Sequence, residues 1–151
     1  MARRLALLTP FAFPSVRGNA VTVERIARGL RARGAEIEVW DLSTMARASV
    51  ERRASEYRPE LVHAFHAYRA GPLGLALARR IGCPLVVTLT GTDANLDLFD
   101  AERAPAVRQV LESAAAVTAF HDSVAAMVAR AAPEMSGRIV IVPQSVDLPD
   151  F

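Results

Sequence analysis

The sequence has 151 residues, of which 52% are hydrophobic and 23% charged, and its formal net charge is +2 at pH 7. This length and composition fit one globular domain with a single core, exclude a disordered chain and give no indication of nucleic-acid binding. All 18 basic residues are arginines, which excludes a lysine-dependent phosphate loop and a Schiff-base enzyme. The single cysteine, Cys83, excludes a disulfide framework and a cysteine-built zinc site.

The amino terminus has one feature of a secretory signal peptide, because Arg3 and Arg4 precede the apolar run Leu5–Leu8. Thr9-Pro10 interrupts that run early and no clear small-residue cleavage site follows, so a β-strand is the favoured interpretation. The longest uncharged stretch, Ile81–Thr92, is far shorter than the roughly 20 residues that span a bilayer. We therefore expect a soluble, cytoplasmic protein.

Short apolar runs alternate with longer segments of helical periodicity, a pattern typical of a parallel sheet covered by helices. In chain order the predicted strands are Leu5–Leu8, Ile37–Trp40, Leu61–Phe65, Leu85–Leu89, Ala116–Ala119 and Arg138–Val142. The predicted helices are one through Val23 and Leu30 that ends at Gly34, then Thr44–Tyr57, Pro72–Ile81, Ala101–Ser113 and Asp122–Ala131. We expect an α/β fold with a doubly wound, mostly parallel Rossmann-like sheet, helices on both faces and a domain spanning residues 1–142.

In such a sheet, ligands bind beyond the carboxyl ends of the strands. The segments that follow the predicted strands are 10–19, 41–43, 66–70, 90–95, 120–122 and 144–147. His66, Asp93 and His121 all fall in these segments, so we expect the binding site at this edge of the sheet.

The first of these segments contains a glycine and opens a helix at Gly18 and Asn19, where backbone N–H groups could face an anion. A tight strand-to-helix turn explains the glycine equally well, and the segment lacks the G-x-G-x-x-G dinucleotide pattern. Asp41, about 20 residues further on, lies where a ribose-binding acid would be expected. A plain strand end is the favoured interpretation of Asp41.

The histidines raise a metal interpretation and a ligand interpretation. His63 and His66 are three residues apart on a strand and so point to opposite faces, and we expect no metal site there. His63 is expected to be partly buried and structural, whereas His66 lies past the strand end and is expected to meet a ligand. His121 opens a helix beside Asp122, and both a ligand contact by His121 and helix capping by Asp122 remain open.

The run Thr88–Asn95 is the most informative stretch, because hydroxyls, a glycine, a carboxylate and an amide follow the predicted central strand. These groups suit hydrogen bonding to a polyhydroxylated or phosphorylated ligand. Asx-type turns would explain one or two of these residues but not easily the whole run.

Several segments, in this order, resemble the amino-terminal half of GT-B glycosyltransferases of family 4, and the resemblance covers essentially the whole chain. Beyond the opening strand and the glycine-bearing loop, the matching segments are Arg31–Val39, Leu61–Ala67, Pro84–Asp93, Ala116–Ala119 and Ile139–Asp147. Thr90–Asp93 and Pro143–Ser145 further resemble a subgroup that includes the selenosugar synthases.

The resemblance implies retaining transfer of a sugar from a nucleotide-diphosphate sugar, without a permanently bound cofactor, in a cleft between two Rossmann-like domains. The amino-terminal domain would chiefly bind the acceptor, a small molecule or a lipid-linked one. Gly18 and Asn19 would approach the donor phosphates, and Asp93 would be catalytic. The acceptor-binding residues would be His66, Thr90, Gly91, Thr92, Asn95 and His121.

The family's carboxyl-terminal domain holds the nucleotide and two glutamates eight positions apart. No such pair occurs here, so we expect that domain to be absent and residues 143–151 to begin an interdomain linker. The family often has a histidine where Thr90 or Thr92 stands, a serine where His121 stands and Asn-Gly where Gln144-Ser145 stands. Because a threonine cannot act as a general base or an imidazolium at neutral pH, that role would be either vacant or filled by Asp93 or a nearby histidine.

One wall of such a cleft cannot stabilise both an oxocarbenium-like state and a departing diphosphate, so we expect this chain alone to be inactive. Two alternatives stay open: a free-standing Rossmann-like nucleotide-binding module that uses Gly18 and Asp41, and a non-catalytic subunit of a two-chain transferase. Arginine-rich helix faces at 25–33 and 47–53 are compatible with a partner or a peripheral membrane contact, although a solvated face is favoured.

Overall fold

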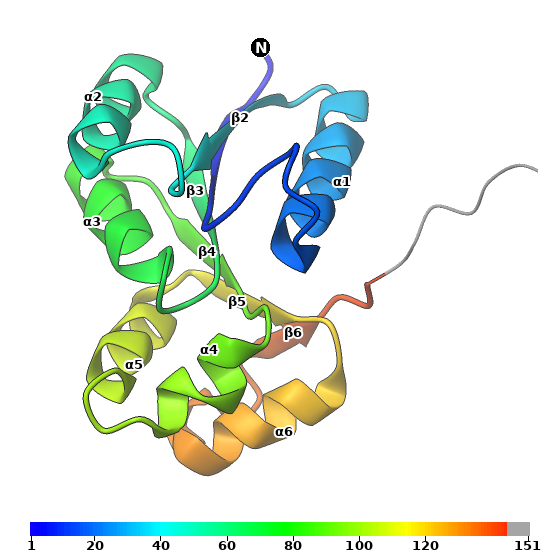
Figure 1. Cartoon of the computed structure of the whole chain (residues 1–151), viewed down its shortest axis with the longest axis vertical. Coiled ribbons are helices and arrows are strands. Elements are labelled where there is room, and N and C mark those ends of the chain that lie inside the picture. Colours follow the sequence, from blue (N-terminus) through cyan, green and yellow to red (C-terminus); the bar gives the residue numbers. More distant parts are fainter. Residues whose placement is uncertain (145–151) are drawn as a thin grey trace, which may run out of the picture.

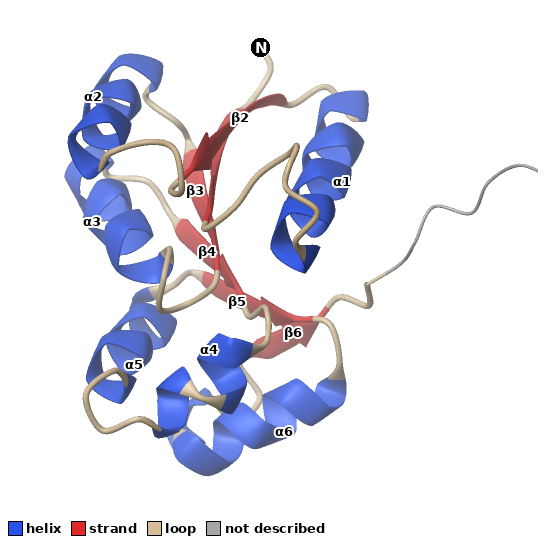
Figure 2. Ribbon diagram, in the orientation of Figure 1, coloured by secondary structure: helices blue, strands red, loops and turns tan. Residues whose placement is uncertain are grey.

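Six parallel strands form one sheet in the part of the chain that the computed structural model describes, residues 1–144. The strands are β1 (Arg4–Thr9), β2 (Glu36–Asp41), β3 (Leu61–Phe65), β4 (Leu85–Thr88), β5 (Ala116–Ala119) and β6 (Ile139–Ile141). Their order is β2-β1-β3-β4-β5-β6 (Figure 2). The chain therefore steps outward from β1 to β2, returns across β1 to β3 and continues the other way, which confirms the predicted doubly wound α/β fold.

The strands are connected by helices that largely match the predicted ones. They are α1 (Gly18–Ala32), α2 (Arg47–Tyr57), α3 (Gly71–Ile81), α4 (Thr92–Asn95), α5 (Ala104–Ser113) and α6 (Asp122–Ala131), with 3₁₀ turns η1 (Asp97–Phe99) and η2 (Pro133–Met135). Within residues 1–144, none of these helices is long and apolar enough to cross a membrane.

The two faces of the sheet are covered unequally. One face buries the larger core, in which side chains of α2, α3, α5 and α6 pack on the strands. The other face carries a smaller cluster built by Val23 and Ala27 of α1 with Leu7, Ile37 and Phe65. Figure 1 shows α1 on the side of the sheet opposite α2 and α3. Helices on both faces are thus confirmed, and α1 covers the second face mainly over β1 and β2.

The segment 90–95 after the central strand contains a helix that was not predicted from the sequence, because Thr92–Asn95 is the short helix α4 and η1 follows it. The physical reason is Asp93, whose carboxylate accepts hydrogen bonds from the backbone N–H groups of Thr90, Gly91 and Ala94 and so closes the turn. Of the predicted linker, only Pro143 and Gln144 lie within the described residues.

Two predicted helices begin three residues later than expected. Thr44 and Met45 donate to the carbonyl of Asp41 in a turn, so α2 starts only at Arg47. The Asp100 carboxylate accepts from the backbone N–H groups of Glu102 and Arg103, which holds 101–103 in a turn ahead of α5.

Candidate functional site

A cleft lies at the carboxyl ends of β1, β3 and β4, at the point where the strand order reverses. It encloses about 660 Å³ of space open to solvent. Its lining comes from three loops far apart in the sequence and consists of Phe11, Arg17, Gly18, Asn19, His66, Arg69, Thr90 and Thr92. The structure therefore brings together five of the residues that the sequence predicts for the site: Gly18, Asn19, His66, Thr90 and Thr92.

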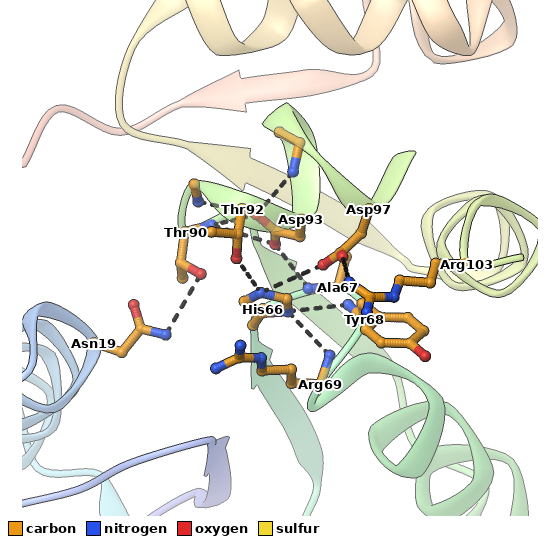
Figure 3. Close-up of polar contacts among 12 residues, drawn as sticks. Asn19, His66, Ala67, Tyr68, Arg69, Thr90, Thr92, Asp93, Asp97 and Arg103 are labelled. Carbon is orange, nitrogen blue, oxygen red and sulfur yellow. Dashed lines mark hydrogen bonds and ion pairs between the residues drawn. The ribbon is translucent and has the colours of Figure 1, made fainter. Parts of the chain in front are cut away.

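His66 is the residue that follows β3, and its backbone is held in an unusual conformation, with φ +89°. Positive φ is uncommon for a residue with a side chain and marks a position that the surrounding structure enforces. The imidazole is 3% exposed. Its Nδ1 accepts hydrogen bonds from the backbone N–H groups of Tyr68 (3.2 Å) and Arg69 (3.0 Å), and its Nε2 lies 2.8 Å from Thr92 Oγ1 (Figure 3).

The His66 ring is held in its neutral form by these surroundings. Burial lowers its pKa below the ordinary value, although the carboxylates of Asp93 and Asp97 act in the opposite direction. A proton on Nδ1 would also face two N–H groups that already point at that atom. His66 is therefore suited to hydrogen bonding at neutral pH and not to carrying a positive charge.

Asp93 lies beneath the cleft and has no exposed surface. Besides the N–H groups of its own loop, its carboxylate accepts from the backbone N–H of Ala67 at 2.8 Å, which fastens the loop after β4 to the loop after β3. A carboxylate with four backbone donors is satisfied and has no face toward a substrate. This position supports a role in holding the two loops together, and it gives no support to the predicted catalytic role of Asp93.

A second buried carboxylate, Asp97, stands behind His66. One oxygen accepts from Arg103 Nη1 at 2.9 Å, and the other lies 3.7 Å from His66 Nε2. The Arg103 guanidinium also lies over the ring of Tyr68, 5.4 Å from its centroid. Figure 3 shows Asp97, Arg103 and Tyr68 grouped on the side of His66 away from Asn19. This group supports the histidine from behind and does not line the cleft.

The opposite wall of the cleft is the start of α1. This helix begins at Gly18, and within residues 1–144 no side chain caps its first backbone N–H groups. Asn19 Nδ2 lies 3.5 Å from Thr90 Oγ1, which links this wall to the loop after β4. The arrangement offers several hydrogen-bond donors to an anionic group.

Sequence reasoning missed Arg17 and Arg69, which line the cleft from opposite loops. The Arg17 guanidinium lies 4.1 Å from the centroid of the Phe11 ring, which holds it over the mouth of the cleft. A usable signal was present, because both arginines lie in segments that follow strands. Asp97 was also missed, because its segment carries no pattern that separates a buried acid from a solvated one.

Besides Asp93, three predicted residues lie outside the lining. Gly91 adopts φ +139° and donates its N–H to Asp93, so it shapes the loop. Asn95 is exposed at the end of α4. The side chain of His121 is 71% exposed and caps α6 by accepting from the Ser123 N–H. The cap that the sequence suggests for Asp122 is therefore made by His121.

The local contacts of His63 and Asp41 bear on two further predictions from the sequence. Burial lowers the pKa of His63 to about 4, and its Nε2 lies 2.7 Å from Thr88 Oγ1, so this histidine is structural. The carboxylate of Asp41 accepts from the backbone N–H groups of Ala12 and Ser43. Within residues 1–144, no group of three His, Cys, Asp or Glu side chains could hold a metal ion.

Comparison with known proteins gives a family match and two informative structural likenesses. The sequence model of glycosyltransferase family 4 matches residues 40–149. The UDP-GlcNAc 2-epimerase from Methanocaldococcus jannaschii superimposes with a TM-score of 0.62 at 10% identity, over 92% of this chain and 45% of the epimerase. Anabaena HepE, solved in complex with UDP, gives a TM-score of 0.66 at 16% identity, over 95% of this chain and 44% of HepE.

These likenesses have different weights. At such low identity the two structures establish the fold alone, a Rossmann-like sheet of the kind found in one half of a GT-B protein. The chain spans less than half the length of either protein. The family model, in contrast, covers most of the sequence, from the end of β2 onward. The chain belongs to glycosyltransferase family 4.

Proposed function

We propose that this chain is the acceptor-binding amino-terminal domain of a transferase that moves a sugar from a nucleotide-diphosphate sugar to an acceptor, with retention of configuration. The cleft carries the proposal. It lies where the strand order reverses, beside β1 and β3, and it gathers an uncapped helix start, two arginines and two threonine hydroxyls. Open α/β sheets bind their ligands at this position, and membership of the family supports sugar transfer.

The donor phosphates are assigned to the start of α1. A helix of 15 residues has a positive end that favours an anion, and Gly18 and Asn19 stand at that end within the cleft. The nucleotide is proposed to be UDP, because HepE was solved with UDP and the epimerase acts on UDP-GlcNAc.

The acceptor is assigned to the other side of the cleft, at His66, Thr90 and Thr92. Asp93 is proposed to act as a positioning residue, since its four backbone contacts hold the loops that carry these three side chains. Acceptor contacts by Asn95 and His121 stay predictions, and so does the selenosugar synthase subgroup.

The rest of the catalytic machinery is proposed to come from a second domain. The described cleft is open to solvent and is lined by this single domain, whereas sugar transfer needs groups on both sides of the reacting centre. We expect negligible transferase activity from these 151 residues alone. The alternative of a dinucleotide-binding module has less support, because both carboxylate oxygens of Asp41 are occupied by loop N–H groups.

Titration of the ¹⁵N-labelled chain with UDP, UDP-GlcNAc and NAD tests this function. We expect UDP and UDP-GlcNAc to shift the amide signals of Gly18 and Asn19. We also expect that no UDP is released from UDP-GlcNAc. Asn19→Asp adds a negative charge at the helix start and is expected to weaken UDP binding about tenfold, whereas Asn95→Asp, outside the lining, serves as the matched control. Binding of NAD alone, or turnover by this chain at enzyme-like rates, would overturn the proposal.

A further inference from the structure

The cleft contains more positive charge than its own side chains neutralise. Arg17 and Arg69 both line it, and neither has an ion-pair partner among residues 1–144. The lining, as far as the described part of the chain forms it, includes no carboxylate. In the close-up of Figure 3 the Arg69 guanidinium extends past His66 toward the side where Asn19 lies.

The two buried acids beside His66, Asp93 and Asp97, do not face the cleft and so form no ion pair with Arg17 or Arg69. All four backbone donors described above occupy the Asp93 carboxylate from within the loops, and Asp97 is paired with Arg103. Both acids are buried on the inner side of His66. A ligand in the cleft therefore meets the guanidinium groups directly.

The hydrogen bonds of His66 determine which of its ring nitrogens carries the proton, and therefore whether His66 or Thr92 donates in the contact between them. Because two backbone N–H groups point at Nδ1, the neutral ring carries its proton on Nε2. That proton is donated to Thr92 Oγ1, 2.8 Å away. Thr92 must then direct its own hydroxyl proton elsewhere, and no other acceptor for it exists within residues 1–144. The Thr92 hydroxyl thus presents a donor to the cleft.

We propose that the acceptor of this transferase carries an oxyanion, a phosphate or carboxylate group, that is bound by the Thr92 hydroxyl and the Arg69 guanidinium. Arg17 faces the same group across the cleft. Such an oxygen accepts without donating, which matches the proton that the Thr92 hydroxyl has to donate, and a guanidinium binds it with charge-assisted hydrogen bonds. His66 acts here as a positioning residue. The inference rests on the proposed function in that it takes the ligand to be the acceptor.

The fixed tautomer can be tested without any ligand. ¹⁵N NMR of the histidine side chains in the whole chain at pH 7 is expected to show His66 with a protonated Nε2 and an unprotonated Nδ1. A ring protonated on Nδ1, or doubly protonated, would free Thr92 from its donor role and overturn the inference.

Oxyanion binding is tested with inorganic phosphate, using a hexose 6-phosphate and the neutral hexose as further probes and sodium chloride at matched ionic strength as the blank. Phosphate and the hexose phosphate are expected to shift the amide signals of Arg69 and Thr92. Thr92→Val and Arg69→Gln should each weaken this binding about tenfold, and Thr92→Ser should retain it. Arg79→Gln, at the other end of α3, is the matched control.

The outcomes separate this inference from the proposed function. Displacement of phosphate by UDP would assign Thr92 and Arg69 to the donor, and equal binding of the neutral hexose would remove the charge requirement; either result overturns the inference. Transfer of sugar by a complete two-domain enzyme is a separate readout. If phosphate binds at Thr92 and Arg69 but no sugar is transferred, the proposed function fails while the oxyanion site stands.

Discussion

The side of the sheet where the strands end, the carboxyl edge, and the side where they begin, the amino edge, differ in the residues that they bury. Every polar or charged residue that is buried among residues 1–144 lies at or near the carboxyl edge: Thr9, Thr22, His66, Thr88, Asp93 and Asp97. The amino edge also has a hollow, beside the start of β4, but apolar and small residues such as Leu75, Ala78 and Pro84 form much of its wall. Both edges are concave, but among residues 1–144 only the carboxyl edge buries threonine, histidine and aspartate side chains.

The backbone shows the same difference. At the amino edge, Gly82 ends α3 in the left-handed conformation that commonly terminates helices. At the carboxyl edge, His66 has φ +89° and Gly91 has φ +139°, and neither ends a helix. Residues with positive φ occur at both edges, with Arg58 and Gly82 at the amino edge, where each ends a helix. Buried polar groups reduce stability unless other contacts compensate, so their concentration at the carboxyl edge indicates where the fold serves binding.

The largest effect is expected from removing the Asp93 carboxylate. Asp93→Ala removes the carboxylate acceptor of four backbone N–H groups at the carboxyl edge, and only that of Ala94 keeps another acceptor, the Gly91 carbonyl. Because unsatisfied buried donors are costly, the free energy of unfolding should fall by about 3–5 kcal/mol, measured by urea denaturation.

Asp122→Ala is the control, since it removes an aspartate from the first turn of α6, where the side chain is 84% exposed. Its urea midpoint should stay close to that of the unchanged chain. A similar loss of stability in both variants would contradict the expectation that the buried Asp93 carboxylate contributes far more to the free energy of unfolding than the exposed Asp122 carboxylate.

Much of the fold could be predicted from the sequence alone. The alternation of apolar and polar residues predicted the strands Leu61–Phe65 and Ala116–Ala119 and the helix Asp122–Ala131 with the bounds that the structure has. The rule for open α/β sheets then predicted the edge at which His66, Thr90 and Thr92 line a cleft. These are local or topological features, and the sequence determines them directly.

Side-chain direction was not predictable in the same way. The contact between Asp93 and the Ala67 N–H joins residues 26 positions apart and exists only because β3 and β4 are neighbours. Arg69 and Arg17 likewise converge through the pairing of β1 with β3. Loop polarity in a sequence indicates that polar groups gather, but tertiary packing decides which of them face inward.

Lowering the pH is expected to destabilise the fold through His63, which contacts Thr88 near the carboxyl edge. The pKa of His63 is about 4 in the fold against 6.5 for the free side chain, so the unfolded chain binds more protons between these values. The free energy of unfolding should therefore be unaffected by His63 above pH 6.5 and fall by up to about 3 kcal/mol as pH drops to 4. Urea denaturation at pH 7 and pH 4.5 should show this loss reduced in His63→Gln, whereas His121→Gln keeps the full dependence.

Two of the four glycines with positive φ among residues 1–144, Gly91 and Gly82, allow the backbone of the two edges to be compared. Gly91→Ala must hold φ +139° and ψ −78°, which a residue with a Cβ rarely adopts, and should cost about 2–3 kcal/mol. Gly82→Ala needs only the left-handed conformation, φ +80° and ψ 36°, and should cost about 1 kcal/mol. Thermal unfolding of both variants measures the difference. If the two substitutions proved equally costly, the backbone of the carboxyl edge would be no more constrained than an ordinary helix end.

The smallest expected effect compares one hydroxyl at each edge. Thr88 Oγ1 is buried and lies 2.7 Å from both His63 Nε2 and Thr118 Oγ1, so Thr88→Val removes a shared partner of two groups and should cost about 1–2 kcal/mol. Ser113 Oγ accepts from Arg79 at 3.2 Å in an exposed position at the amino edge, where water replaces the lost partner. Ser113→Ala should therefore change the free energy of unfolding by less than about 0.5 kcal/mol. Urea denaturation of the two variants resolves this difference, and a larger cost for Ser113→Ala than for Thr88→Val would mean that the amino edge, with its apolar hollow, depends on polar contacts after all.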